Sequence, residues 1–232
     1  MEGRKDIYGA RGSSVAERVF LTMLTGAYVG VAWWLLFDGI EPISTLLNWP
    51  LSPGDTTRRL CLGIALTVYF IRLLFTQFLF LKRALSWAEA AMIGLWLLLI
   101  YPLFAIAGGT NAAQPKDYFG LGIILFLLGS WMNSHAEYAR HKWKQRPENY
   151  ARPYTLGLFR YSRHPNYLGD LISFTGLCLV SGRWVCVAIP AIMLAGFVFV
   201  NIPMLDAHLH DHYGPAFDKY AERTSKLIPF LY

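Results

Sequence analysis

The chain has 232 residues, of which 55% are hydrophobic and only 16% are charged, and its mean hydropathy is +0.35. Soluble domains carry about 25% charged residues, so this composition excludes an ordinary soluble domain as well as a disordered chain. The formal net charge is +6, which raises the question of where the basic residues gather. Three cysteines lie in or beside apolar runs without metal-ligand spacing, and we interpret them as buried thiols: Cys61, Cys178 and Cys186.

Apolar segments long enough to cross a bilayer recur along the whole chain. The first, 19–37, contains no charge and precedes no small-residue cleavage site, which favours a transmembrane helix over a signal peptide. Further spans are expected at 61–81, 90–107, 118–132, 167–182 and 184–205. Because no repeat or interdomain linker separates them, the sequence predicts a single integral membrane domain over residues 1–232. Its fold class is all-α, a helical bundle of about six transmembrane helices.

The basic residues predict how this bundle is oriented. Six spans place both termini on one side of the membrane. Sixteen Lys and Arg residues lie on that side, in the two termini, at 82–83 and in the 134–166 segment, whereas four lie opposite: Arg58, Arg59, Lys116 and Arg183. By the positive-inside rule, the N- and C-termini and the long basic segment are expected to be cytoplasmic.

A polar stripe is predicted where the fourth span continues into the basic segment. Helical spacings of three, four and seven place Asn133, Glu137, Arg140 and Lys144 on one face. An amide, a carboxylate and two cations can together meet phosphate, ribose and an amide-bearing ring. The alternative is a cytoplasmic face whose lysines bind anionic lipid headgroups.

A second polar cluster, 163–170, runs directly into the fifth span. Arg163, His164 and Pro165 could simply begin a helix, with proline in its first turn. Asp170 argues for more, because a carboxylate inside a membrane helix is costly unless it meets a partner or a wet cavity. Asn166 lies four residues earlier and therefore shares its face.

The second span and the C-terminal tail contain further candidates. Arg72 lies in mid-span, where a charged residue is by default functional or paired. Tyr69 lies one turn earlier, and its hydroxyl is either satisfied locally or available to donate to a developing enolate. In the tail, three histidines alternate at positions 208, 210 and 212, but on a helix only the outer two share a face, so no metal site is expected.

These segments resemble a known membrane family. The run Arg163-His-Pro-Asn-Tyr-Leu-Gly-Asp170-Leu, with His212-Tyr-Gly-Pro-Ala-Phe and the terminal Ile-Pro-Phe-Leu-Tyr, is similar to the C-terminal part of the sterol reductases. The order Asn133-x-His-x-Glu137-Tyr, Gly157-Leu-Phe and Leu-Ile-Pro-Phe resembles the steroid 5-alpha-reductases. The resemblance covers roughly residues 133–232, and isoprenylcysteine carboxyl methyltransferases belong to the same superfamily. Glu137 stands where the reductases usually have Asp, Asp170 stands where they have Glu, and a Gln-Glu pair that faces substrate in the steroid enzymes is missing.

The resemblance implies a cytoplasmic pocket for NADPH in the 133–232 half. The residues implied to line it are Asn133, Glu137, Arg140, Lys144, Arg163, His164, Asn166, Asp170 and Tyr213. Tyr69-Phe-x-Arg72 is similar to the short motif whose tyrosine faces the steroid carbonyl, so these two residues are the candidate catalytic groups. The implied reaction reduces a carbon–carbon double bond in an enone-type steroid or other lipid, and the expected partners are that substrate and the bilayer, without nucleic acid or metal.

Two other functions fit part of the pattern. An S-adenosylmethionine-dependent membrane methyltransferase could act on a lipid, a thiol or a prenylcysteine. Such enzymes usually place paired acids before the final amphipathic segment, where this chain has one acid between Met204 and His208. A lipid-binding scaffold without catalysis would leave Asp170 and Arg72 without a purpose. Several cations match the phosphates of NADPH, so we favour the reductase. No Gly-x-Gly-x-x-Gly motif is present, so we do not expect a Rossmann domain.

Overall fold

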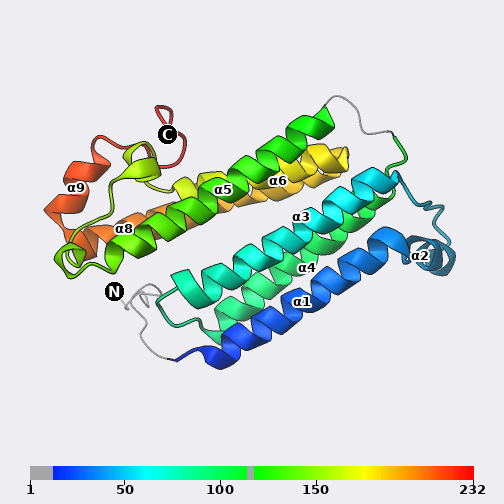
Figure 1. Cartoon of the computed structure of the whole chain (residues 1–232), viewed down its shortest axis with the longest axis horizontal. Helices are drawn as coiled ribbons and strands as arrows, with labels where there is room; N and C mark the ends of the chain where they lie inside the picture. Colours follow the sequence, from blue (N-terminus) through cyan, green and yellow to red (C-terminus); the bar gives the residue numbers. More distant parts are fainter. Residues whose placement is uncertain (1–12, 114–117) are drawn as a thin grey trace.

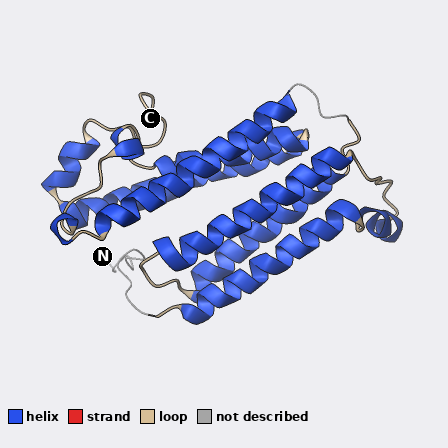
Figure 2. Ribbon diagram, in the orientation of Figure 1, coloured by secondary structure: helices blue, strands red, loops and turns tan. Residues whose placement is uncertain are grey.

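The computed structural model describes residues 13–113 and 118–232 of the chain (Figure 1). All named elements in these ranges are helices (Figure 2), and the remaining pairing is an isolated bridge between Ser162 and Ser225. The main helices are α1 (Val15–Phe37), α2 (Ile40–Leu47), α3 (Thr56–Phe75), α4 (Trp87–Gly109), α5 (Tyr118–Lys144), α6 (Pro165–Ser181), α7 (Ala188–Gly196), α8 (Ile202–Tyr213) and α9 (Pro215–Ala221). The predicted all-α fold is confirmed.

Most of the predicted spans appear as long apolar helices. Within the described residues, five helical segments are long and apolar enough to cross a membrane: Val15–Phe37, Thr56–Phe80, Trp87–Gly109, Tyr118–Lys144 and Trp184–Tyr213. The first helical turn after α3 and the junction of α7 with α8 are π-helical, so each of those two segments continues without a break. α6 matches the remaining predicted span, and its 17 residues lie at the short end of the range for crossing the hydrocarbon core. The chain is an integral membrane protein.

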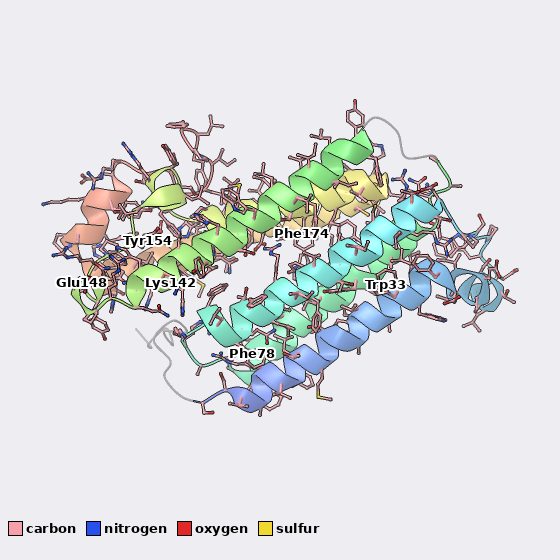
Figure 3. All side chains as sticks on the ribbon, viewed as in Figure 1. Trp33, Phe78, Lys142, Glu148, Tyr154 and Phe174 are labelled. Carbon is pink, nitrogen blue, oxygen red and sulfur yellow. The ribbon has the colours of Figure 1, made fainter. Side chains whose placement is uncertain are left out.

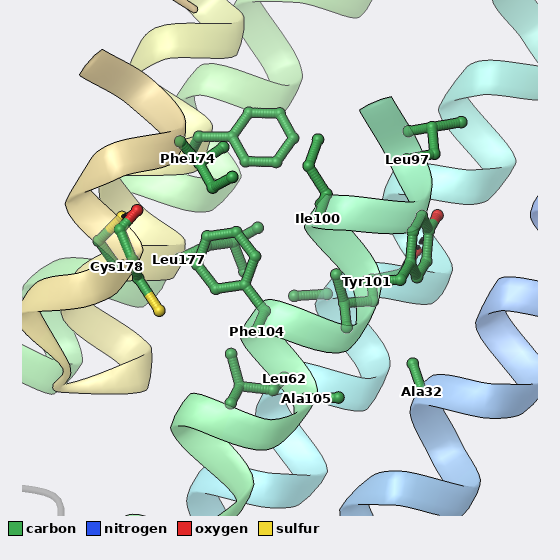
Figure 4. Close-up of a cluster of buried hydrophobic side chains, with 14 of the residues drawn as sticks. Ala32, Leu62, Leu97, Ile100, Tyr101, Phe104, Ala105, Phe174, Leu177 and Cys178 are labelled. Atoms are coloured by element: carbon green, nitrogen blue, oxygen red, sulfur yellow. Dashed lines mark hydrogen bonds between the residues drawn. The ribbon is translucent and has the colours of Figure 1, made fainter. Parts of the chain in front are cut away.

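The helices form two groups that meet along α6. α1, α3 and α4 lie side by side, and α5 runs along α6 (Figure 1). The core is apolar. Phe104 of α4 meets Phe174 of α6 between the groups, and Tyr101 of α4 faces α1 and α3; all three side chains are completely or almost completely buried (Figure 4). The start of α1 and the C-terminus lie at one end of the bundle, and α2 lies at the other, as an even number of spans requires.

Arginines close the ends of several helices. Arg59 donates to the carbonyls of Leu36 and Phe37 at the end of α1, and Arg58 donates to the carbonyl of Val180 near the end of α6. Arg183 donates to Thr110 O after α4 at 3.2 Å. These side chains satisfy carbonyls that have no partner within their helices and place positive charge at the negative end of each helix dipole. Of the other basic residues in the predicted charge pattern, Arg4, Lys5, Arg11 and Lys116 lie outside the described residues.

Glycines allow α5 and α6 to pack with their backbones in contact. A Cβ added at Gly129 would lie 2.4 Å from the carbonyl oxygen of Gly169, and a Cβ at Gly169 would lie 2.7 Å from the carbonyl oxygen of Gly129. No side chain fits at either position without separating the helices. This contact fixes the two helices that carry most of the predicted site residues.

We expect Gly129→Ala to lower the free energy of unfolding by about 1–3 kcal/mol, the usual cost of inserting a methyl group into a filled interface. Gly120→Ala is the matched control, because a Cβ at Gly120 on the same helix would have nothing within 4 Å. Thermal unfolding in detergent measures both. Equal midpoints for the two variants would show that α5 and α6 do not pack as closely as described.

Candidate active site

A cavity of about 740 Å³ lies at the end of the bundle where α5 and α8 end. Figure 3 shows Lys142, Glu148 and Tyr154 at this end and Phe174 near the middle of the bundle. Seven of the nine residues predicted to bind a cofactor line the cavity: Glu137, Arg140, Lys144, Arg163, His164, Asn166 and Tyr213. These residues come from three segments that are far apart in the sequence: the polar stripe of α5, the start of α6 and the end of α8. The fold brings all three into one cavity wall.

The stripe on α5 is held by the start of α6. The carboxylate of Glu137 is buried and accepts from Arg140 Nη2 at 2.7 Å and from Asn166 Nδ2 at 2.9 Å. Asn133 donates to the backbone carbonyl of Asn166 at 3.1 Å. Asn133, Glu137 and Arg140 lie on one face of α5, as helical spacing predicts. Asn166 of α6 contacts two of them and so completes this hydrogen-bonded cluster. Glu137 thereby fixes the positions of a cation and an amide in the cavity wall.

Lys144 links the end of α5 to α8. Its ammonium donates to the hydroxyl of Tyr213 and to the backbone carbonyl of Arg152 at 2.9 Å. It also lies 4.5 Å from the centre of the Tyr213 ring. Both residues line the cavity, so this contact joins α5 to α8 in its wall.

Asp206, a single acid in its stretch of the sequence and not among the predicted site residues, contacts two residues of the cavity wall. It accepts from Arg163 Nη2 at 2.8 Å, and its other oxygen lies 2.9 Å from His164 Nε2. Both partners are buried, with side-chain exposures of 7% for Arg163 and 2% for His164, so neither could lose this carboxylate without cost. The sequence predicts that the last span ends at residue 205, one position before Asp206, whereas the helical segment continues to Tyr213. An acid at the end of an apolar span is the signal that could have identified Asp206 from the sequence.

Arg72 of α3 and Asp170 of α6, both predicted site residues, meet inside the membrane. Arg72 Nη2 donates to Asp170 Oδ1 at 2.8 Å, and Arg72 Nη1 donates to Ser130 Oγ at 3.2 Å. Asp170 thus has the partner that its place in a membrane helix requires, and this partner is Arg72. Neither Asp170 nor Tyr69 is among the residues that line the 740 Å³ cavity.

Tyr69 lies next to this ion pair and packs into the apolar core. Its ring contacts Phe174 edge-on at 5.0 Å and Tyr101 at 6.4 Å, and the Arg72 guanidinium carbon lies 5.8 Å from the ring centre. The structure therefore brings Tyr69, Arg72 and Asp170 together at mid-span. Their catalytic role remains a prediction.

The composition of the cavity wall fits a phosphate-bearing dinucleotide. Arg140, Lys144 and Arg163 supply cations, and Lys82 and Arg83 from the turn before α4 add two more. Arginine and lysine are the side chains best suited to pyrophosphate and to an additional phosphate on a ribose. Aromatic rings complete the wall, including Tyr154, and burial raises the pKa of its hydroxyl, which therefore remains a neutral donor at physiological pH.

A metal centre has no comparable support in the part of the chain that the structure describes. There, no three His, Cys, Asp or Glu side chains gather in a group that could hold a metal ion. His208 and His212 do share a face of α8, as their spacing predicts, and their rings stack with centres 6.2 Å apart.

Comparison with known proteins places this membrane bundle in a family. Residues 82–224 match the family described as "Protein of unknown function (DUF1295)", which is steroid 5-alpha-reductase-like, and the chain belongs to this family. The 3-oxo-5-alpha-steroid 4-dehydrogenase 2 of Homo sapiens is 32% identical over 114 residues, which are 49% of this chain and 43% of that protein. The match with the human protein thus spans less than half of its length.

Two further relatives show the range of the similarity. The 3-oxo-5-alpha-steroid 4-dehydrogenase 2 of Mus musculus is 27% identical over an alignment of 237 positions, which covers 99% of this chain and 89% of that protein. A probable O-methyltransferase of Ustilaginoidea virens is 36% identical over 112 residues, 47% of this chain and 39% of that protein. The predicted resemblance to the steroid 5-alpha-reductases is confirmed at the level of the family.

We expect Asp206→Ala to destabilise the protein by about 3 kcal/mol, because it leaves a buried guanidinium and a buried imidazole without their shared carboxylate. Asp211→Ala is the control, since Asp211 is an exposed carboxylate on the same helix. The measurement is the shift in thermal unfolding of the purified protein. If Asp206→Ala unfolds at the same temperature as Asp211→Ala, Asp206 does not hold Arg163 and His164.

Proposed function

We propose that this chain is an integral-membrane oxidoreductase that uses NADPH to reduce a carbon–carbon double bond in an enone-type steroid or other lipid. The observation that carries the proposal is a basic cavity at one end of the bundle, with an ion pair and a tyrosine inside the membrane beyond it. The human and mouse relatives are 3-oxo-5-alpha-steroid 4-dehydrogenases, which supports the same class of reaction. The substrate class is proposed from chemistry and family membership together.

The residues of the cavity would hold NADPH through complementary charge and hydrogen bonding. Arg140, Lys144 and Arg163 suit its phosphates, while the Asn166 side chain is an amide beside them. When bound, NADPH supplies the hydride. Glu137 keeps Arg140 in place, Asp206 keeps Arg163 in place, and Tyr213 contacts Lys144, so the wall is organised before any ligand arrives.

Tyr69 and Arg72 are proposed to stabilise the substrate during the reaction. Reduction at the β-carbon of an enone moves negative charge onto the carbonyl oxygen. A donor fixed at that oxygen stabilises the transition state more than the ground state. Tyr69 supplies a hydroxyl and Arg72 a cation that Asp170 holds in place. We propose Tyr69 as the donor and Arg72 as the group that favours the charged state beside it.

A methyltransferase is the second candidate, favoured by the similarity to the probable O-methyltransferase of Ustilaginoidea virens. S-adenosylmethionine has no phosphate, so it would give the basic side chains of the cavity wall no anionic group to bind. The single acid in the relevant segment, Asp206, already accepts from two donors. These two features make the reductase the better proposal.

The cofactor is proposed to bind from the cytoplasm. The cavity lies at the end of the bundle that carries the 134–166 segment and the C-terminus. This is the end where the positive-inside rule places the cytoplasm.

We expect NADPH to raise the thermal stability of the detergent-solubilised protein, because a ligand that binds only the folded state stabilises it by about 2.7 kcal/mol at 100 times its Kd. S-adenosylmethionine at the same concentration should have a much smaller effect. In sealed vesicles, NADPH added outside should raise the thermal stability only of protein whose basic cavity and termini face the outside. Stabilisation by S-adenosylmethionine and not by NADPH would reverse the order of the two candidates.

Lys144→Ala should weaken NADPH binding more than NADH binding, since a cation that meets the 2′-phosphate has nothing to meet in NADH. The loss expected for NADPH is roughly tenfold or more. Lys142→Ala removes an exposed lysine two positions away that does not line the cavity, and it should leave both affinities unchanged. Fluorescence titration gives the Kd of NADPH and of NADH for each variant. An equal loss of affinity for both cofactors in Lys144→Ala would place Lys144 away from the 2′-phosphate.

Tyr69→Phe keeps the ring and removes the proposed donor. We expect turnover of an enone lipid to fall by roughly a hundred- to a thousandfold, the scale for losing one oxyanion donor, while NADPH affinity stays nearly unchanged. Tyr101→Phe removes a neighbouring hydroxyl that donates to the carbonyl of Leu66 and serves as the control. Single-turnover oxidation of NADPH separates the binding of the cofactor from the transfer of hydride. Full activity in Tyr69→Phe would show that Tyr69 only packs in the core.

A further inference from the structure

The chain that connects α3 to α4 forms one wall of the basic cavity. We refer to its residues 76–83 as the α3–α4 turn, and five of them line the cavity: Thr76, Phe80, Leu81, Lys82 and Arg83. The ring of Phe80 meets the ring of His141 edge-on with centres 5.7 Å apart, so this wall lies against the end of α5. The positions of the cations on Lys82 and Arg83 therefore depend on the conformation of this turn.

The side chain of Arg83 is held by the start of α4. Its two terminal nitrogens donate to the two carboxylate oxygens of Glu89 at 2.9 and 2.7 Å. Glu89 also accepts from the backbone N–H of Ser86 at 3.2 Å, while Ser86 Oγ accepts from the backbone N–H of Glu89, so the pair forms a capping box. A two-point contact between a guanidinium and a carboxylate is directional, and it fixes Arg83 against α4.

The backbone of the α3–α4 turn is held by Arg18 of α1, which begins at the same end of the bundle (Figure 1). Arg18 Nη1 donates to the carbonyl of Gln77, and Arg18 Nη2 donates to the carbonyls of Leu81 at 3.1 Å and of Arg83 at 2.8 Å. Arg18 Nε donates to Ser14 Oγ at 3.0 Å, so all three nitrogens of the guanidinium are engaged. A cation suits these carbonyls, because they lie where the helical segment ends.

Arg18 differs from the arginines at the opposite end of the bundle in which carbonyls it binds. Arg59 donates to the carbonyls of Leu36 and Phe37, and neither of those residues lines the basic cavity. Arg18 binds the backbone of a turn that does line it. Among the described residues, no side chain of α1 lines the cavity itself. The family match begins at residue 82 and does not include Arg18.

We propose that Arg18 is a positioning residue of the basic cavity: by binding three carbonyls of the α3–α4 turn, it keeps Lys82 and Arg83 where they meet the phosphates of a bound dinucleotide. This inference rests on the proposed function, because it gives Arg18 a part in binding NADPH. Arg18 acts only through the turn. A turn that is ordered in advance raises affinity, because binding does not have to order it.

The first test compares two arginines that bind carbonyls at helix ends. Arg18→Leu removes the contacts with the turn and should weaken NADPH binding about tenfold or more, the loss expected for one misplaced charged hydrogen bond. Arg59→Leu is the matched control at the opposite end of the bundle and should leave the Kd unchanged. The Kd is measured by fluorescence titration of the full chain in lipid nanodiscs. Equal Kd values for the two variants would overturn the proposal.

A milder variant decides the question if Arg18→Leu does not fold. Arg18→Gln keeps one donor group that can reach a carbonyl of the turn, so its loss of NADPH affinity should be smaller than tenfold but measurable. Arg18→Lys keeps the positive charge and should bind NADPH more tightly than Arg18→Gln, because a cation suits carbonyls at a helix end better than a neutral amide. A folded Arg18→Gln protein with the Kd of the unaltered protein would also contradict the role of Arg18.

Hydrogen–deuterium exchange tests the contact between Arg18 and the turn without any cofactor. The backbone amides of residues 78–85 should exchange faster in Arg18→Leu than in Arg59→Leu, because a segment opens more easily once its contacts are removed. Equal exchange in the two variants would overturn the proposal, as would faster exchange with an unchanged Kd for NADPH. If exchange differs as expected but the unaltered protein does not bind NADPH, the proposed function is wrong, whereas the hold of Arg18 on the cavity wall is supported.

Discussion

The ion pair between Arg72 and Asp170 is the contact on which the arrangement of the site depends. Either charge alone would be costly inside the hydrocarbon core, so each requires the other, at 2.8 Å. The pair joins α3 of one helix group to α6 of the other, and Ser130 of α5 adds a third helix. A buried ion pair is a weak source of net stability, but it is specific, because a shifted register would leave two charges unpaired.

The same constraint explains the positions of the two cavities. The pair keeps α3 against α6 at mid-span, while the glycine contact keeps α5 against α6. A cavity of about 330 Å³ remains between α3 and α5, and Arg72 lines it. At the end of the bundle, α5 and α8 enclose the basic cavity, and Glu137 and Asp206 hold its cations. In both places, acidic side chains set the positions of their arginine partners: Asp170 for Arg72, Glu137 for Arg140 and Asp206 for Arg163.

Basic residues serve two purposes in this chain, and the sequence alone does not separate them. At the end opposite the basic cavity, Arg58, Arg59 and Arg183 donate to carbonyls at helix ends. At the other end, Arg140 and Lys144 line a cavity. Counting charges predicted on which side each group lies, but only their partners distinguish a helix cap from a ligand-binding side chain.

Much of the fold and part of the candidate site followed from the sequence. Hydropathy located the spans, and helical spacing placed Glu137, Arg140 and Lys144 on one face, because both depend on local periodicity. α2 was not anticipated, since its 8 residues are too few to give a span signal. The partner of Arg72, the role of Asp206 and the packing of Tyr69 against Phe174 were also not anticipated. Each depends on contacts between segments far apart in the chain, which no local pattern specifies.

The central claim is that this membrane protein transfers hydride from NADPH to an enone lipid. Transfer of deuterium from labelled NADPH to a steroid tests this claim most directly. NADPH carrying deuterium at C4 of the nicotinamide ring would be incubated with the purified chain and a Δ4-3-oxosteroid, and the product would be examined by mass spectrometry and NMR. The account predicts a saturated ketone with deuterium at the former β-carbon. A steroid that acquires no deuterium, together with transfer of a methyl group from S-adenosylmethionine to a lipid acceptor by the same preparation, would contradict it.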